Sequence, residues 1–229
     1  MTEFLISLAA FVAAHVLPAR TGLRARAIDR FGHRPYMAAY SVLSLALVAW
    51  VVSAASRAPH VALWPQAPWQ AAVPVVAMPV ALTLLVAGLA QPNLLSISLV
   101  RAGGSGDPAG IVRVTRHPVL WGFGLWAAAH VPPNGDLVSV VLFAGLTVFA
   151  FAGMAGLDRR RRREMGDGPW RDAARATSNF PFAAILAGRS RLPADSRTLA
   201  ATAIAIAAYL ALLLGGHAAL FGVDPLALF

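Results

Sequence analysis

Long apolar runs are the feature that most constrains how this chain can fold. A helix that crosses the hydrocarbon core of a bilayer needs roughly 20 consecutive, mostly apolar residues. Six segments meet or nearly meet this length, at residues 2–19, 35–56, 73–91, 114–131, 137–157 and 198–221. We therefore expect an all-α integral membrane protein with about six transmembrane helices in one domain over residues 1–229. Apolar residues after Pro92 allow the third helix to continue, kinked, to Arg101.

The composition agrees with insertion into a membrane. Hydrophobic residues make up 58% and charged residues 13% of the chain, whereas soluble domains carry about 25% charged residues. The net charge is +9, but the arginines lie between the apolar runs, so we expect a lipid bilayer and not nucleic acid as the partner. The chain has no cysteine, which excludes disulfides, thiolate catalysis and iron–sulfur ligation by its own residues.

The arginines are distributed unevenly between alternate connections. Five lie between the first and second apolar segments, three before the fourth and ten between the fifth and sixth, whereas Arg57 alone lies on a connection of the other side. Cytoplasmic loops carry an excess of basic residues, so we expect both termini on the non-cytoplasmic side. Residues 158–197 should then form a cytoplasmic surface segment with short amphipathic helices.

Three histidines lie in apolar surroundings, at His15, His130 and His217. Polar and ionisable groups within the bilayer are costly, and each is a candidate for function. A single histidine of this kind is more often explained by a hydrogen bond between helices than by ligation. Three of them together strengthen the interpretation as ligands.

The stretch from Arg113 to Asp136 is the most informative. Trp126 and His130 are four residues apart and share a helical face with Gly122. Small residues on such a helix permit the close approach of a neighbouring helix or of a flat ligand. Two interpretations stay open: tight helix packing alone, or a flat macrocycle between helices with an imidazole as axial ligand.

Several motifs spread over nearly the whole chain resemble the NnrU family. They are Phe11-Val-Ala-Ala-His15, Gly22-Leu-Arg-Ala-Arg, Arg34-Pro-Tyr, the 113–136 stretch, Ala176-Thr-Ser-Asn179-Phe-Pro-Phe and His217-Ala-Ala-Leu-Phe-Gly-Val-Asp-Pro-Leu. The resemblance implies a multi-pass protein of the bacterial inner membrane, linked to nitrite and nitric oxide reduction. It implies no settled biochemical activity, so a non-catalytic assembly factor for a denitrification enzyme is one hypothesis.

The NnrU family is related to plant 15-cis-zeta-carotene isomerase, which resembles this chain mainly over residues 11–40 and 110–136. That resemblance implies haem b with His15 and His130 as axial ligands, and a carotenoid-like hydrophobic substrate. One departure is Ala127, which stands where the isomerase has a cysteine. Any ligation that depends on that cysteine is therefore absent here.

The depth of each histidine in the bilayer leaves other ligand pairs open. His130 lies roughly 20 Å along a regular helix from His117, so depth alone pairs His15 with His117 and His130 with His217. We keep His15 and His130 as the predicted metal ligands, with His117 and His217 as alternatives. The other residues predicted to contact the cofactor are Arg20, Arg113 and Arg116 for its propionates, with Gly122 and Trp126.

The triplet Arg116-His117-Pro118 supports a second resemblance, to membrane methyltransferases that act on isoprenylcysteine or phospholipids. It implies an S-adenosylmethionine site formed by His117 and Glu164. The paired glutamates of those enzymes are reduced to Glu164 here. A His-Pro pair is also explained by a helix start with proline in its first turn.

Overall fold

The described residues are helical and contain no β-strand, as the sequence predicts. The computed structural model describes residues 1–100, 108, 110–227 and 229. They divide into two compact units, the first of residues 1–64 and 135–142, and the second of residues 65–134 and 143–229.

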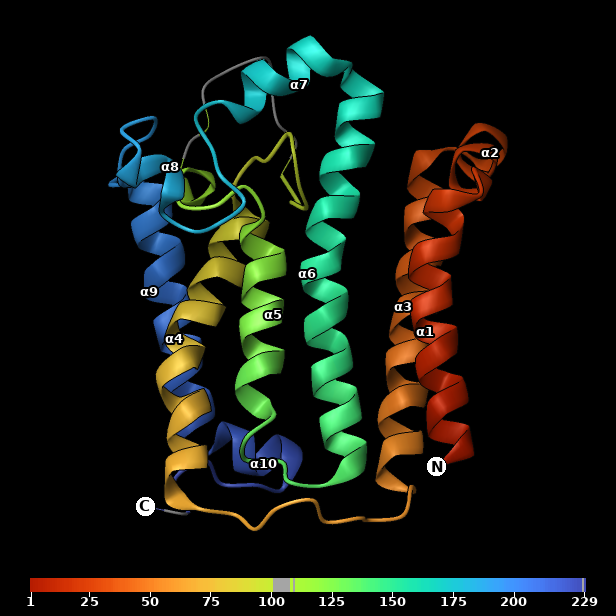
Figure 1. Cartoon of the computed structure of the whole chain (residues 1–229), viewed down its shortest axis with the longest axis vertical. Helices are drawn as coiled ribbons and strands as arrows, with labels where there is room; N and C mark the ends of the chain where they lie inside the picture. Colours follow the sequence, from red (N-terminus) through yellow and green to blue (C-terminus); the bar gives the residue numbers. More distant parts are fainter. Residues whose placement is uncertain (101–107, 109, 228) are drawn as a thin grey trace. The chain divides into compact units, whose positions relative to one another are not determined.

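The first unit contains α1 (Thr2–Arg20), α2 (Leu23–Phe31), α3 (His33–Ser56) and the start of α6 (Leu137–Met165). Figure 1 shows α1 beside α3, with the short helix α2 connecting them. The buried apolar cluster of this unit includes Phe4 of α1, Val51 and Ala54 of α3, and Val138 at the start of α6. An ion pair of 2.7 Å between Glu3 and Arg57 joins the two helices near the N-terminus.

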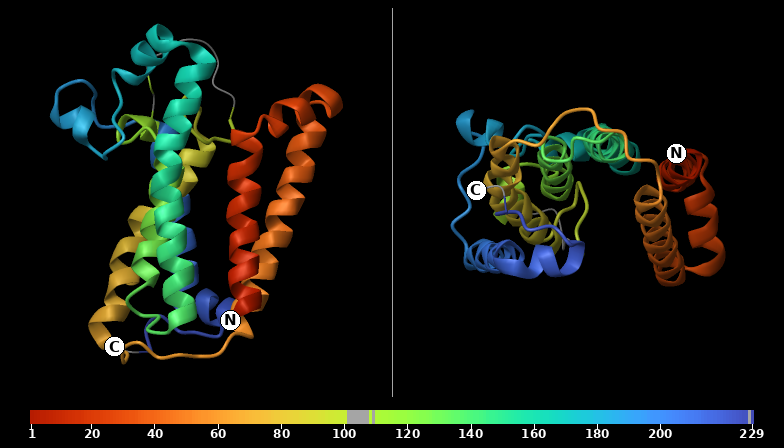
Figure 2. Two further views of the ribbon diagram at one scale, coloured as in Figure 1. Left: turned by 45° about the vertical axis from the view of Figure 1, so that its right-hand side comes forward. Right: turned by 90° about the horizontal axis from the view of Figure 1, so that it is seen from below.

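The second unit is a bundle in which α4 packs against both α5 and α9 (Figures 1 and 2). Its elements are α4 (Pro68–Ala90), the 3₁₀ helix η1 (Gly110–Arg113), α5 (Pro118–His130), the remainder of α6, α7 (Asp167–Ala174), α8 (Ala183–Leu186), α9 (Ser196–Ala211), the π-helical segment η2 (Leu212–Gly216) and α10 (His217–Phe221). Its buried core joins α4, η1 and α9 through Leu84, Ala87, Ile111, Val114 and Ala201.

Glycines allow α4 and α5 to lie close together. A Cβ atom on Gly122 would come within 2.6 Å of the Leu85 Cγ and 2.7 Å of the Ala81 carbonyl oxygen. A Cβ atom on Gly88 would meet Pro118 and Val119 at 2.9 Å. The small residues of the 113–136 stretch therefore serve helix packing, the first of the two interpretations offered by the sequence.

Four helical segments are long and apolar enough to cross a membrane: α3, α4, α6 and the segment Ser196–Phe221. A fifth is added if α1 and α2, which bend by 71°, form one broken span. The predicted span at 114–131 forms only the 13 residues of α5, about 20 Å of helix against a hydrocarbon core of about 30 Å. The all-α fold is thus confirmed and four candidate spans support a multi-pass membrane protein, while the count of six and the sides of the termini stay predictions.

Two predicted helix ends differ from the structure. The continuation of the third helix toward Arg101 is wrong, because α4 ends at Ala90 and Gln91 is extended in front of Pro92, as a residue before proline prefers. The fifth helix was expected to end at residue 157, but α6 continues to Met165 and includes the arginine run. Basic side chains are favourable in the last turns of a helix.

Candidate functional site

A buried polar network surrounds His117, the residue that caps the N-terminus of α5. His117 is fully buried. Its Nδ1 lies 2.8 Å from the Ser96 Oγ and its Nε2 lies 3.2 Å from the Asp158 Oδ1. Both ring nitrogens are therefore engaged by protein groups from residues 91–100 and from α6.

Arg116 joins the same carboxylate from the neighbouring position. Its Nη1 donates to the Asp158 Oδ2 at 2.6 Å, its Nε donates to the Thr177 Oγ1 at 3.0 Å, and its guanidinium stacks 5.1 Å from the ring of Trp170. The carboxylate of Asp158 thus compensates the positive charge of the buried Arg116 guanidinium and orients the buried His117 imidazole. This network holds the start of α5 against α6 and the segment after α7.

Asp158 is the residue that sequence reasoning missed. The sequence predicts it as the first residue of a surface segment, yet its side chain is only 21% exposed and reaches two partners more than 40 positions earlier. A lone acid at the end of an apolar helix, before five arginines, was the available signal, because an isolated carboxylate near the bilayer needs a partner.

His130 is held in a different way at the other end of α5. Its Nδ1 lies 2.7 Å from the Trp126 carbonyl oxygen, and its ring packs 5.5 Å from the Trp126 ring and 5.3 Å from the Phe143 ring. The Asn134 side chain donates to the His130 carbonyl oxygen at 2.7 Å. The helix end is thereby capped, and the imidazole is fixed through one nitrogen.

His15 and His217 repeat this arrangement on other helices. The Nδ1 of His15 lies 2.7 Å from the Phe11 carbonyl oxygen, and its ring lies 5.6 Å from the ring of Tyr40 in α3. The Nδ1 of His217 lies 2.7 Å from the Val223 carbonyl oxygen. Because a carbonyl oxygen only accepts, each Nδ1 carries the proton, and the lone pair lies on Nε2.

The candidate ligands belong to both units. His15 lies in the first unit, whereas His117, His130 and His217 lie in the second. Among the residues that the structure describes, no three His, Asp or Glu side chains are grouped as a metal site; a haem iron needs one or two axial imidazoles only.

The structure gives each residue that was predicted to contact the cofactor a different set of neighbours. Gly122 is used for packing against α4, and the guanidinium of Arg116 is bound by Asp158 and Thr177. The Nε of Arg113 donates to the Pro108 carbonyl oxygen, Arg20 is exposed at the end of α1, and Trp126 lies beside His130.

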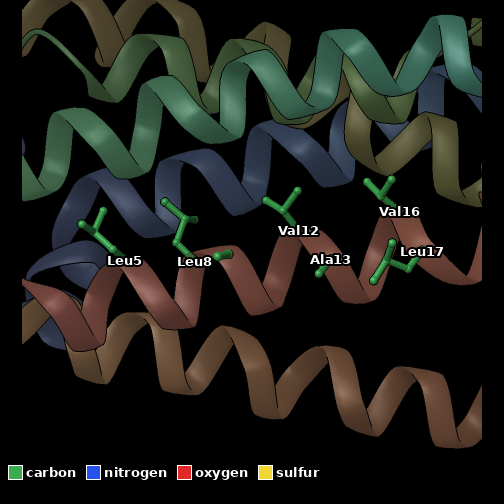
Figure 3. A pocket seen from close by; sticks show the side chains of 7 residues that line it. Leu5, Leu8, Val12, Ala13, Val16 and Leu17 are labelled. Carbon is green, nitrogen blue, oxygen red and sulfur yellow. The ribbon is translucent and has the colours of Figure 1, made fainter.

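One face of α1 is an open apolar hollow (Figure 3). Its side chains recur at helical spacing and carry no polar atom. They are Leu5, Leu8, Ala9, Val12, Ala13, Val16 and Leu17. Such a surface fits hydrocarbon, as in an acyl chain or a polyene.

The sequence model of the NnrU protein family matches residues 3–225. This chain belongs to the NnrU family. The resemblance inferred from the motifs is thereby confirmed. No solved structure matches this NnrU chain.

Two chloroplastic 15-cis-zeta-carotene isomerases are similar to part of this NnrU chain. The enzyme of Zea mays is 38% identical over 86 residues, which cover 38% of this chain and 23% of the enzyme. The enzyme of Arabidopsis thaliana is 36% identical over 109 residues, which cover 44% of this chain and 29% of the enzyme. The matched part is thus less than a third of either enzyme.

The two residues of the methyltransferase hypothesis, His117 and Glu164, are bound by other side chains of this NnrU chain. His117 is bound by Ser96 and Asp158, as described above. The carboxylate of Glu164 is bound by Arg160 at 2.6 Å and by Arg161 at 3.0 Å, on the surface of α6. The other interpretation of His117-Pro118 is confirmed, because α5 begins at Pro118 with His117 as its N-cap.

Proposed function

We propose that this NnrU-family membrane protein binds haem b through His15 and His130 and isomerises a carotenoid-like polyene. One observation carries the haem proposal. At both histidines the backbone carbonyl four residues earlier binds Nδ1 at 2.7 Å. The lone pair of Nε2 is the one that a haem iron takes, and a carbonyl partner on the other nitrogen orients the ring and raises its basicity.

The local surroundings of the two histidines fit a macrocycle. The ring of His130 packs against Trp126 and Phe143, and the ring of His15 packs against Phe11 and Tyr40. Aromatic and apolar neighbours suit a flat hydrophobic ligand. When bound, haem would supply an iron centre that can polarise or exchange an electron with a polyene, while the protein holds the axial imidazoles in one tautomer.

The substrate class rests on the similarity to the two carotene isomerases. It is also supported by the apolar hollow on α1, whose lining provides only hydrocarbon contacts. A cis double bond in a polyene has no group for a polar site to recognise. Binding then depends on burial of hydrocarbon, which contributes about 25 cal/mol for each Å² removed from water.

Haem content is the direct test. The protein is produced with haem synthesis supplied, and the reduced-minus-oxidised spectrum is recorded per mole of purified chain. We expect haem in the wild type and its loss in His15→Ala and His130→Ala, with retention in His217→Ala and in the control His33→Ala, whose side chain is exposed. Loss at His130 and His217 would indicate the alternative pair, and a wild type without haem would overturn the proposal.

Activity is tested separately with 15-cis-zeta-carotene in proteoliposomes. The haem-loaded wild type should change the isomer composition seen by chromatography, and His130→Ala should not. A haem-loaded wild type that leaves the carotene unchanged would contradict the isomerase assignment while leaving haem binding intact. The link to nitrite and nitric oxide reduction, implied by the family resemblance, would then be examined through nitric oxide binding to the reduced haem.

A further inference from the structure

The segment from Ser178 to Leu186 is firmly attached to the start of α5. The Arg116 backbone N–H donates to the Ser178 carbonyl oxygen, and the Phe182 backbone N–H donates to the Val114 carbonyl oxygen, both at 2.8 Å. The Thr115 hydroxyl and the Trp121 indole both donate to the Asn179 carbonyl oxygen at 2.8 Å. These bonds fix the backbone of the segment.

The turn within this segment holds Phe182 in an unusual backbone conformation. Its φ is +64°, and no other non-glycine residue in the described part of the chain has a positive φ. The Ser178 hydroxyl donates to the Phe180 carbonyl oxygen and accepts from the Ala184 backbone N–H. Such strain persists only where the surrounding structure imposes it, and it is concentrated at sites with a function.

This rigid turn directs large apolar side chains outward. Phe180 is 70% exposed, Phe182 is 49% exposed and Leu186 is 86% exposed. Phe180 is held at an angle to the ring of Trp121, with 5.8 Å between the ring centroids. The positive φ of Phe182 and the exposure of Phe182 and Leu186 have no explanation in the packing of the unit itself.

Two observations indicate what covers these side chains. Figure 1 shows α8 at the end of the second unit where α9 begins, so this segment lies near one edge of the candidate span Ser196–Phe221. Three arginines, Arg189, Arg191 and Arg197, follow the turn within 11 positions of Leu186. Apolar anchors next to basic side chains match the boundary between acyl chains and anionic headgroups.

We propose that residues 178–186 form an interfacial membrane anchor. Phe180, Phe182 and Leu186 insert among the acyl chains, and the exposed arginines Arg191 and Arg197 bind the phosphates of anionic lipids. The hydrogen bonds that join this segment to Val114, Thr115, Arg116 and Trp121 couple the position of the membrane surface to the start of α5. The inference is independent of haem binding and of isomerase activity.

The absence of native cysteine allows a depth measurement at single positions. A nitroxide is attached at Leu186→Cys in proteoliposomes of phosphatidylcholine with phosphatidylglycerol, and its accessibility to oxygen and to a water-soluble nickel chelate is compared. Matched labels at Asp172→Cys, on the exposed surface of α7, and at Ile204→Cys, within α9, give the water and acyl-chain references.

We expect the label at position 186 to favour oxygen over the chelate, at a depth between the two references. Equal chelate accessibility at 186 and 172 would overturn the anchor and would indicate a surface that is open to water or to a protein partner. Replacing phosphatidylglycerol by phosphatidylcholine should make the label shallower, and Arg191→Gln with Arg197→Gln should abolish that difference. A depth that does not depend on lipid charge would overturn the role of the arginines.

Discussion

Two histidines lie at opposite ends of the short helix α5, His117 as its N-cap and His130 as its last residue, yet their surroundings differ. His117 is fully buried and both of its ring nitrogens have partners. His130 is tied through Nδ1 to its own helix and packs among aromatic rings. A histidine that completes an ion network stabilises the fold, whereas one oriented through Nδ1 retains the lone pair that a ligand needs.

The largest effect is expected at the carboxylate on which His117 depends. Asp158→Ala removes the carboxylate that the guanidinium of Arg116 and the ring of His117 share, so that Arg116 keeps Thr177 and His117 keeps Ser96 as hydrogen-bond partners. Breaking a buried ion pair costs about 3 to 5 kcal/mol. We expect a loss of this size in the free energy of unfolding, measured by denaturant titration in detergent.

The control for Asp158 is Glu164→Ala, on the same helix. Its carboxylate pairs with Arg160 and Arg161 at the surface, and exposed pairs of this type contribute about 0.5 kcal/mol. Equal effects of the two replacements would show that the His117 network is not the anchor of α5, and the distinction between the two histidines would fail.

The helix between the two histidines provides the next test. Gly122→Ala places a Cβ atom against Leu85 and the Ala81 carbonyl oxygen of α4, and overpacking of this kind costs about 1 to 3 kcal/mol. Gly145→Ala in α6 is the control, because a Cβ atom there meets nothing within 4 Å. A gain in stability of about 0.5 to 1 kcal/mol is expected for this control. If both replacements stabilise the protein, close packing does not fix α5.

The smallest effect concerns the exposed carboxylate of Asp195 at the start of α9, in contrast to the partly buried carboxylate of Asp158 that holds α5. Asp195 accepts hydrogen bonds from the Thr198 backbone N–H and hydroxyl. These bonds lower the pKa of Asp195 below its ordinary value. Loss of such a cap costs about 1 kcal/mol, so Asp195→Ala should be less stable than the wild type by this amount at neutral pH.

The lowered pKa sets the direction of the pH dependence at Asp195. A carboxyl group with a folded-state pKa below its unfolded value contributes stability above the unfolded pKa, and this is lost as the pH falls through the folded pKa. The difference between wild type and Asp195→Ala should therefore shrink below about pH 4. A difference that stays constant down to pH 2 would show that the ionised form is not what caps α9.

The sequence predicts some parts of this structure well because they depend on neighbouring residues. Long apolar runs predict the spans in α3, α4, α6 and α9, and Pro118 after His117 predicts a helix start. The segment predicted at 73–91 ends within one residue of α4, whereas its continuation toward Arg101 was wrong, because the apolar residues after Pro92 do not prolong the helix. The link from Asp158 to Arg116 and His117 was missed because it joins residues more than 40 positions apart, and no local pattern encodes such a contact.

The separation of tasks between the two ends of α5 is tested most directly by measuring haem content and unfolding on the same two variants. His130→Ala and His117→Ala are purified after expression with haem synthesis supplied, and each is assayed for the reduced haem spectrum per folded chain and for its denaturation midpoint. We expect His130→Ala to lose the haem signal while its midpoint stays close to that of the haem-free wild type, since a bound ligand itself adds stability, and His117→Ala to keep haem in its folded fraction while unfolding at lower denaturant. Full haem content in His130→Ala, or loss of haem in folded His117→Ala, would contradict this account.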